Sequence, residues 1–256
     1  MTSNAVCPKC AGTGFIIVEG ANVSGAKPCD CRLQGRAERL EERAQIPPLY
    51  REASLDNFVV PGPDNPIARR ELTTVLMAVK KYVDHFPSEG RPGLLLIGEP
   101  GTGKTHLAVA AMRKIIEKGF EAVFCDYQNL LDRIRSGYDA NSNSSDKEAY
   151  RVALDSEVLL LDDLGAHRIS DWVEDTVTSI VTHRCNHRKA LIATTNVPDA
   201  EAGSAVIQRN ALARPEYRRT LGDQIGARAR SRLFEMCTVV KMPLMEDYRI
   251  RKGKQF

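Results

Sequence analysis

This 256-residue sequence has no long apolar run, few aromatic side chains and no strong excess of either charge. Phe, Trp and Tyr together make up 6% of the chain, and the formal net charge is +3. No run approaches the roughly 18 apolar residues that a membrane-spanning helix needs. The first residues, MTSNAVC, have neither the basic start nor the apolar core of a signal peptide. We therefore expect a cytoplasmic protein with no membrane partner, in a compartment where disulfides are rare.

The basic residues are unevenly distributed along the chain. Residues 205–256 carry twelve basic and five acidic side chains, whereas residues 1–60 carry seven of each. A surplus of this kind suits a nucleic acid or nucleotide partner. A solvated surface would suit it nearly as well, so charge alone leaves the partner open.

Short apolar runs alternate with amphipathic helical patterns from residue 66 onward. Because the runs are apolar throughout and helices separate them, we expect an α/β fold with a parallel sheet covered on both faces. A charged helical stretch before residue 47 is interrupted by two prolines, and residues 139–147 read as a polar loop. The expected strands are 94–97, 122–125, 158–161, 190–194 and 237–242, and the expected helices are 72–83, 105–118, 127–138, 171–186 and 223–235.

A glycine-rich segment, GEPGTGKTHLA, follows the first apolar run and fits the pattern G-x-x-x-x-G-K-[ST]. Its glycines let backbone amides curl around phosphates, and the following helix start adds a positive dipole end. Lys104 would reach the β- and γ-phosphates of ATP, and the Thr105 hydroxyl would help to hold Mg²⁺. The expected nucleotide-binding residues are Gly98, Glu99, Pro100, Gly101, Thr102, Gly103, Lys104 and Thr105.

Two later strands end in polar side chains that complete the nucleotide site. The run VLLL leads into Asp162 and Asp163, and the run ending in ATTN leads to Asn196. The carboxyl ends of parallel strands meet at the edge where ligands bind. We expect Asp162 to hold Mg²⁺, directly or through water, and Asp163 to orient or activate the attacking water. Asn196 would place its amide beside the γ-phosphate.

Four of the seven cysteines lie in the first 31 residues, as the pairs Cys7-x-x-Cys10 and Cys29-x-Cys31. Four thiolates on short chelate loops suit tetrahedral Zn²⁺, although unliganded thiols, a redox pair or an iron–sulfur site are alternatives. A segment this small buries no core of its own, so zinc, worth on the order of 10–16 kcal/mol in small peptides, would decide whether it folds. We expect a zinc-binding module and linker helix over residues 1–45 and the nucleotide-binding core over residues 46–256.

Together these segments resemble AAA+ ATPases, and more narrowly the DnaC/DnaI-type replicative helicase loaders and their IstB-type relatives. The resemblance covers about residues 7–250 and rests on GEPGTGKTHLA, LLLDDLG, ATTN, IGARARSRLFE and the lead-in AQIPPLYREASLDNF. It implies a P-loop three-layer sandwich with a five-stranded parallel sheet in the order 5-1-4-3-2. It also implies that the lead-in helps to wall the base, and that the N-terminal module grips the helicase.

The resemblance assigns further roles and also shows two departures. It implies that Asn196 is sensor 1 and that Arg232 is the arginine finger offered to a neighbouring subunit, with Arg228 and Arg230 as alternatives. Many AAA+ proteins have Glu where this chain has Asp163. The lid is expected to be truncated, and Arg249 is either a surviving sensor-2 arginine or part of a charged tail. ATP turnover is therefore expected chiefly in a self-assembled or partner-bound state.

Other candidate residues have weaker patterns. Relatives of this kind elaborate the region between the second and third strands to face single-stranded DNA, and here it carries Arg133, Arg135 and Tyr138, which are also typical of a solvated helix face. Two histidines and a cysteine at 183, 187 and 185 read as structural rather than metal-binding. Cys125 and Cys237 read as core thiols.

Three functions are consistent with these residues. The first is an ATP-hydrolysing loader that binds a hexameric replicative helicase and single-stranded DNA during replication. The second is an IstB-type transposition helper, which predicts double-stranded DNA binding and filament growth and is disfavoured by the cysteine-rich front end. The third is a nucleotide-gated DNA-binding module with negligible hydrolysis.

Overall fold

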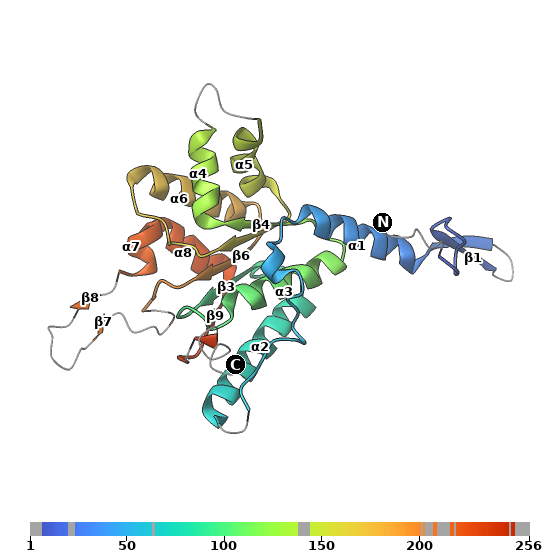
Figure 1. Ribbon diagram of the computed structural model, residues 1–256. Helices are drawn as coiled ribbons and strands as arrows, with labels where there is room; N and C mark the ends of the chain where they lie inside the picture. The colour runs from blue at the N-terminus through green and yellow to red at the C-terminus, as the bar shows by residue number, and fades with distance from the viewer. Residues whose placement is uncertain are drawn as a thin grey trace.

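The centre of the chain is a five-stranded parallel sheet with helices on both faces (Figure 1). The structure is a computed structural model, and it describes residues 7–19, 24–62, 65–137, 144–200, 202, 207–208, 216–217, 219–245 and 247–248. Within these segments, no helix has the length and apolar character needed to cross a membrane.

The sheet has the strand order β4-β5-β6-β3-β9, and all four pairings are parallel. Counted from β3 as the first core strand, this is the predicted order 5-1-4-3-2, read from the opposite edge, so the prediction is confirmed. The first four strands are buried along almost their whole length, because helices cover both faces. The strands are β3 (Gly93–Ile97), β4 (Ala122–Asp126), β5 (Val158–Asp162), β6 (Ala190–Thr195) and β9 (Cys237–Lys241).

Two hydrophobic cores form, one on each face of the sheet. Alternate residues of β3 point to opposite sides: Leu94 and Leu96 belong to one core, and Leu95 and Ile97 to the other. The first core is covered by α1 (Asp30–Arg43), α2 (Pro66–Asp84) and α3 (Lys104–Glu117). The second is covered by α4 (Tyr127–Ser136), α5 (Ser144–Asp155), α6 (Asp171–Asn186), α7 (Leu221–Ile225) and α8 (Ala227–Met236).

An antiparallel hairpin lies at the end of α1 that points away from the sheet (Figure 1). It is formed by β1 (Phe15–Glu19) and β2 (Ser24–Pro28), and the sequence did not lead us to expect it. Short elements elsewhere are the 3-10 helix η1 (Pro48–Tyr50) and the two-residue strands β7 (Ile207–Gln208) and β8 (Glu216–Tyr217). The hairpin therefore lies apart from the five-stranded sheet, at the far end of α1 (Figure 1).

One loop prediction and one helix prediction need correction. Residues 144–147, expected in a polar loop, form the first turn of α5; residues 138–143 lie outside the described segments. The helix expected over 223–235 is instead two helices separated at Gly226, whose φ of +84° belongs to the left-handed region that favours glycine. A Cβ at this position would approach Glu174 Oε1 to 2.5 Å. The break is therefore built into the packing of α7 and α8 against α6.

The last turn of α1 and the lead-in after it are both fixed to α3, the helix that follows the glycine-rich loop. Arg113 Nε donates to Glu41 Oε1 at 2.6 Å, and Arg113 Nη1 donates to the Ala53 carbonyl at 2.8 Å. Ala44 and Ile46 are buried in the same core as α3. These contacts place residues 48–58 beside the loop. The division of the chain at residue 45 stays a prediction.

A buried arginine on α6 joins three segments of the second core. Arg184 has no exposed surface, and its guanidinium donates to the carbonyls of Ala153 at 2.9 Å, Ser156 at 3.0 Å and Ala190 at 2.5 Å. Burial lowers the pKa of Arg184 to about 10. The side chain thus satisfies backbone groups at the end of α5, before β5 and at the start of β6.

Candidate functional site

The loop from Gly98 to Gly103 connects β3 to α3 and has the shape of a phosphate cradle. Gly101 and Gly103 have φ of +71° and +90°, in the left-handed region that residues with a Cβ rarely adopt. A Cβ on Gly103 would also lie 2.7 Å from the Phe58 ring. The conformation of the loop therefore requires glycine at these two positions.

Lys104 is the first residue of α3, and it is buried. Its Nζ donates to the Glu99 carbonyl at 2.9 Å and to Asn196 Oδ1 at 2.5 Å. The amino end of α3 opens into the same loop and adds backbone N–H donors and a positive dipole end. Lysine and helix end together make a site for an anion such as a phosphate.

Asp162 ends β5 at the carboxyl edge of the sheet and is 8% exposed. Thr105 Oγ1 donates to Asp162 Oδ1 at 2.9 Å, so the loop and the strand meet at this carboxylate. Burial raises the pKa of Asp162, while hydrogen bonds from Thr194 and Thr105 act against that shift. A carboxylate and a hydroxyl beside a phosphate cradle are the oxygen ligands that Mg²⁺ takes in such sites.

Asp163 and Asn196 are joined directly. Asn196 Nδ2 donates to Asp163 Oδ1 at 2.7 Å, while its Oδ1 accepts from Lys104. Asp163 has φ of +56°, a left-handed conformation that Asp tolerates better than most residues. The structure therefore brings together the residues that the sequence assigned to the phosphate, the attacking water and the sensor.

A cavity of about 700 Å³ opens beside this cradle. One wall comes from the lead-in, with Leu49, Tyr50 and Phe58, and another from residues after β9, with Met245 and Tyr248. Apolar and aromatic side chains of this kind line ligand pockets that bury a planar base. The lead-in was expected at this wall; Met245 and Tyr248 were not.

The chain returns over the glycine-rich loop after β9. Met242 N donates to the Ile97 carbonyl at 2.7 Å, and Tyr248 N donates to the Gly101 carbonyl at 3.1 Å. A Cβ on Gly98 would lie 2.6 Å from Met242 Cβ. Glycine at position 98 thus leaves room for the chain that returns after β9. The glycine itself was the sequence signal that another segment packs closely against this position. Arg249, the expected sensor-2 candidate, lies outside the described residues.

The three candidate finger arginines lie on α8 and differ in their surroundings. Arg230 donates to both carboxylate oxygens of the buried Asp199, at 2.6 and 2.7 Å. Arg228 is exposed, and Arg232, also exposed, donates to Glu235 Oε2 at 2.7 Å. Arg230 is therefore held by an ion pair within the chain, whereas Arg232 lies on a solvent-exposed face of α8. Its finger role stays a prediction.

The candidate DNA-contacting residues are only partly described. Arg135, at the end of α4, places its guanidinium 4.6 Å from the centre of the Trp172 ring. Arg133 is half-buried on the same helix, and Tyr138 lies outside the described residues. A stacked arginine at the end of an amphipathic helix is compatible with both expected roles, contact with single-stranded DNA and a solvated face.

His183, Cys185 and His187 lie at the end of α6, where the sequence predicts structural roles for them. His183 and His187 stack with their ring centres 4.1 Å apart. In the described part of the chain, the groups close enough to share a metal ion include neither of these histidines nor Cys185. Cys125 and Cys237 are buried in the second core, as predicted.

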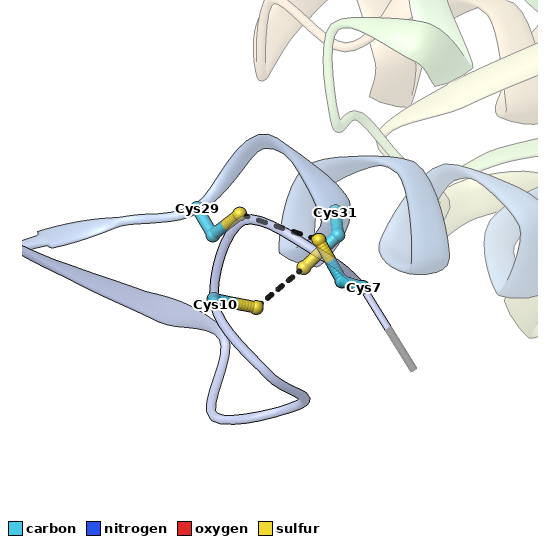
Figure 2. Close-up of side chains that lie close together, drawn as sticks. All are labelled: Cys7, Cys10, Cys29 and Cys31. Atoms are coloured by element: carbon cyan, nitrogen blue, oxygen red, sulfur yellow. Dashed lines mark hydrogen bonds between the residues drawn. The ribbon is translucent and has the colours of Figure 1, made fainter. Parts of the chain in front are cut away.

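The four N-terminal cysteines converge, as Figure 2 shows. Their sulfur atoms all lie within 4.8 Å of one another; Cys7 and Cys29 are 3.8 Å apart, and Cys10 and Cys31 are 3.4 Å apart. Tetrahedral Zn²⁺ with bonds of about 2.3 Å would separate its sulfur ligands by about 3.8 Å. The Gly14 amide donates to Cys10 Sγ at 3.4 Å, which is a typical second contact of a zinc thiolate.

The thiols influence one another strongly. Burial raises the pKa of Cys10, yet hydrogen bonds from Cys31 and from the Gly14 amide lower it overall to about 6. The hydrogen bond to Cys10 raises the pKa of Cys31 to about 12. Four thiolates this close repel one another unless a cation compensates their charge. The donor set, spacing and backbone amide therefore fit a zinc ion.

Comparison with known proteins supports the reading of this site. Residues 86–216, which include the cradle, both aspartates and Asn196, match the family described as IstB-like ATP binding protein. The uncharacterized protein YqaM of Bacillus subtilis is 29% identical over 177 residues, which cover 66% of this chain and 54% of YqaM. The replicative helicase loader DnaC of Buchnera aphidicola (subsp. Baizongia pistaciae) is 23% identical over 155 residues, 60% of each chain. The matched segments thus span less than two thirds of these relatives.

The fold is that of a solved helicase loader. A crystal structure of the DnaC helicase loader superposes with a TM-score of 0.60 and 29% identity, and the match covers 77% of this chain and all of that one. This likeness agrees with the α/β fold and its five-stranded parallel sheet. The family match extends over more than half of the chain. This chain therefore belongs to the IstB-like ATP-binding protein family and has the AAA+ fold of the DnaC loaders.

Proposed function

We propose that the protein is an ATP-hydrolysing loader of a hexameric replicative helicase that also binds single-stranded DNA. The observation that carries the proposal is the connected set of Lys104, Asn196 and Asp163 beside the Thr105–Asp162 pair. Phosphoryl transfer requires a cation at the phosphates, oxygen ligands for a metal ion and a base near the attacking water, and these residues supply all three. The likeness to the DnaC loader structure supports a replicative helicase as the partner.

Each residue has a defined task in this proposal. Lys104 holds the β- and γ-phosphates, and Thr105 with Asp162 would hold Mg²⁺, which neutralises charge on the phosphates when bound. Asp163 accepts a proton from the attacking water, and Asn196 orients that water. In the structure Asn196 bonds to both Lys104 and Asp163, so an incoming phosphate competes with Asn196 for the lysine.

The zinc-binding hairpin is the proposed contact with the helicase. Phe15, Ile17 and Val18 on β1 are 42%, 75% and 51% exposed. Apolar side chains at such exposure, on a small module held away from the core, suit a protein–protein contact. Zn²⁺ bound by the four cysteines would fix the hairpin against α1, whose first turn contains Cys31.

The proposal also includes ATP-dependent self-assembly. Arg232 is exposed on α8. An arginine finger supplied in trans must reach the nucleotide of a neighbouring subunit, and an exposed position suits that role. Arg133 and Arg135 are the proposed DNA-contacting residues among those described.

The deciding experiment is a pull-down of the host's hexameric helicase by the zinc-loaded protein, with ATP or with ADP. We expect retention that depends on nucleotide and that is reduced at least tenfold by the double change Ile17→Ser and Val18→Ser. A matched control is Met77→Ser, which alters an apolar side chain 64% exposed on α2. Failure to retain helicase under either nucleotide would contradict the loader proposal.

A transposition helper is the second candidate, because the matching family is named for IstB. This function predicts ATP-dependent filaments on double-stranded DNA and no helicase retention. Filaments seen by electron microscopy, together with a negative pull-down, would favour it.

Absence of ATP turnover, even with helicase and single-stranded DNA present, would instead favour a nucleotide-gated binding module.

A further inference from the structure

Thr194, the fifth residue of β6, contacts both acidic residues of the nucleotide site. Its Oγ1 donates to Asp162 Oδ1 at 2.6 Å and accepts from the Asp163 backbone amide at 3.0 Å. The side chain is fully buried. We infer that Thr194 is a positioning residue, which sets the metal-binding carboxylate and the water-activating carboxylate relative to each other. This inference rests on the proposed ATPase function and deepens it.

The pairing of the strands explains why this residue reaches both aspartates. β5 and β6 run parallel with Leu161 opposite Ala193, so the next residues, Asp162 and Thr194, lie side by side at the sheet edge. Side chains alternate along a strand. Thr194 and Asn196 therefore face the site, where Thr194 donates to the Asp162 carboxylate and Asn196 donates to the Asp163 carboxylate. Thr195 faces away and donates to the Leu164 carbonyl at 2.7 Å.

The hydroxyl group suits this position because it donates one bond and accepts another. An amide N–H only donates, so the Thr194 proton must point to the Asp162 carboxylate. Both hydroxyl groups on this carboxylate, from Thr194 and Thr105, bind Oδ1. Among the described residues Oδ2 accepts no hydrogen bond, which leaves it for a metal ion.

The same hydroxyl stabilises an uncommon backbone conformation. Asp163 has a positive φ of +56°, and its amide is held by Thr194 Oγ1. The turn that follows is held by a second bond, from the Leu164 amide to the Thr194 carbonyl at 2.8 Å. Removal of the hydroxyl would therefore loosen Asp163 as well as Asp162, and both the metal and the base would lose their alignment.

The test compares Thr194→Val with Thr195→Val, because both changes remove a fully buried hydroxyl that makes two bonds. Affinity for a fluorescent ATP analogue is measured across a Mg²⁺ titration and in EDTA. Loss of a group that orients a metal ligand costs about 10–100-fold in metal affinity. We expect Thr194→Val to raise the half-saturating Mg²⁺ concentration at least tenfold, with affinity in EDTA unchanged within twofold.

The conservative variant Thr194→Ser should restore the wild-type Mg²⁺ dependence within twofold, and Thr195→Val should leave it unaltered. If Thr194→Val does not fold, Thr194→Cys, which keeps a weak donor of similar size, should raise the half-saturating Mg²⁺ concentration severalfold. A folded Thr194→Val or Thr194→Cys protein with wild-type Mg²⁺ dependence would overturn the inference alone. A wild-type protein whose nucleotide binding ignores Mg²⁺ would overturn both the inference and the proposed ATPase.

Discussion

Single side chains connect segments that are far apart in this sequence. Lys104 and Asn196 meet at the phosphate cradle, and Arg184 ties together α5, β5 and β6. The nucleotide-site residues could be predicted because each belongs to a short motif whose chemistry is local. Arg184 and Tyr248 could not, because their partners are set by how distant parts of the chain pack.

Replacement of Arg184 by Met should be strongly destabilising. The change keeps an unbranched side chain but leaves the carbonyls of Ala153, Ser156 and Ala190 without their donor. Each buried carbonyl left unpaired costs about 1–3 kcal/mol, so a loss of about 3 kcal/mol or more is expected in urea denaturation. Arg151→Met is the control, since the Arg151 side chain is 79% exposed. Equal stabilities of the two variants would contradict the clamp role.

Replacement of Asp163 by Asn should separate binding from hydrolysis. The amide is nearly the same size and keeps an oxygen for Asn196, but it accepts no proton from water. Loss of a general base lowers turnover by about 10²–10⁴-fold. We expect that loss in steady-state ATPase, with ATP affinity within a few-fold of wild type. Asp175→Asn, an exposed change on α6, is the control. Full activity of Asp163→Asn would remove Asp163 from the mechanism.

At the scale of elements, the helices and strands of the core followed from hydrophobic periodicity, but their interruptions did not. The break at Gly226 depends on contact with Glu174 on another helix, and the start of α5 at Ser144 lies in a stretch with a polar composition. The zinc hairpin is a further case. Its first strand does contain an apolar run, Phe15–Val18, but three of these four side chains are exposed, so the run belongs to no hydrophobic core of the kind used to predict the other strands.

Removal of zinc should unfold the hairpin and leave the core folded. A strong chelator should expose four thiols to Ellman's reagent at neutral pH, whereas the core cysteines should stay unreactive. Burial raises the pKa of Cys125 to about 11, so this thiol is protonated at neutral pH and becomes reactive only as the pH rises toward that value. Burial also raises the pKa of Cys237.

The control for this measurement is the same titration in denaturant, where all seven cysteines should react. Zinc released by the chelator should reach one ion per chain by elemental analysis. Rapid reaction of the four N-terminal thiols before any chelator is added would contradict the zinc site.

At the scale of the whole molecule, the nucleotide site lies at the edge of the sheet, and Arg232 lies on the exposed face of α8. If Arg232 acts on a neighbour's ATP, two inactive variants should complement each other. Arg232→Ala keeps its own catalytic residues, and Asp163→Asn keeps its arginine. A mixture should therefore recover part of the ATPase activity that each variant lacks alone.

Mixing Asp163→Asn with Arg228→Ala serves as the comparison for this experiment, because Arg228 is exposed on the same helix. Equal activity of Arg232→Ala and wild type would exclude Arg232 as the finger. Absence of recovery in the mixture, with both variants folded and inactive alone, would exclude a site shared between subunits.

The attachment of α1 to α3 also has a mechanical consequence. With 14 residues, α1 is about 21 Å long, and the hairpin lies at its far end (Figure 1). Its near end is fastened to α3 through Glu41 and Arg113, and α3 begins at the lysine that would hold the phosphates. A tilt of α3 by a few degrees would therefore displace the hairpin at the far end of α1 by more than it displaces Glu41. Nucleotide exchange at α3 would then change the position of the hairpin without any change in the structure of the hairpin.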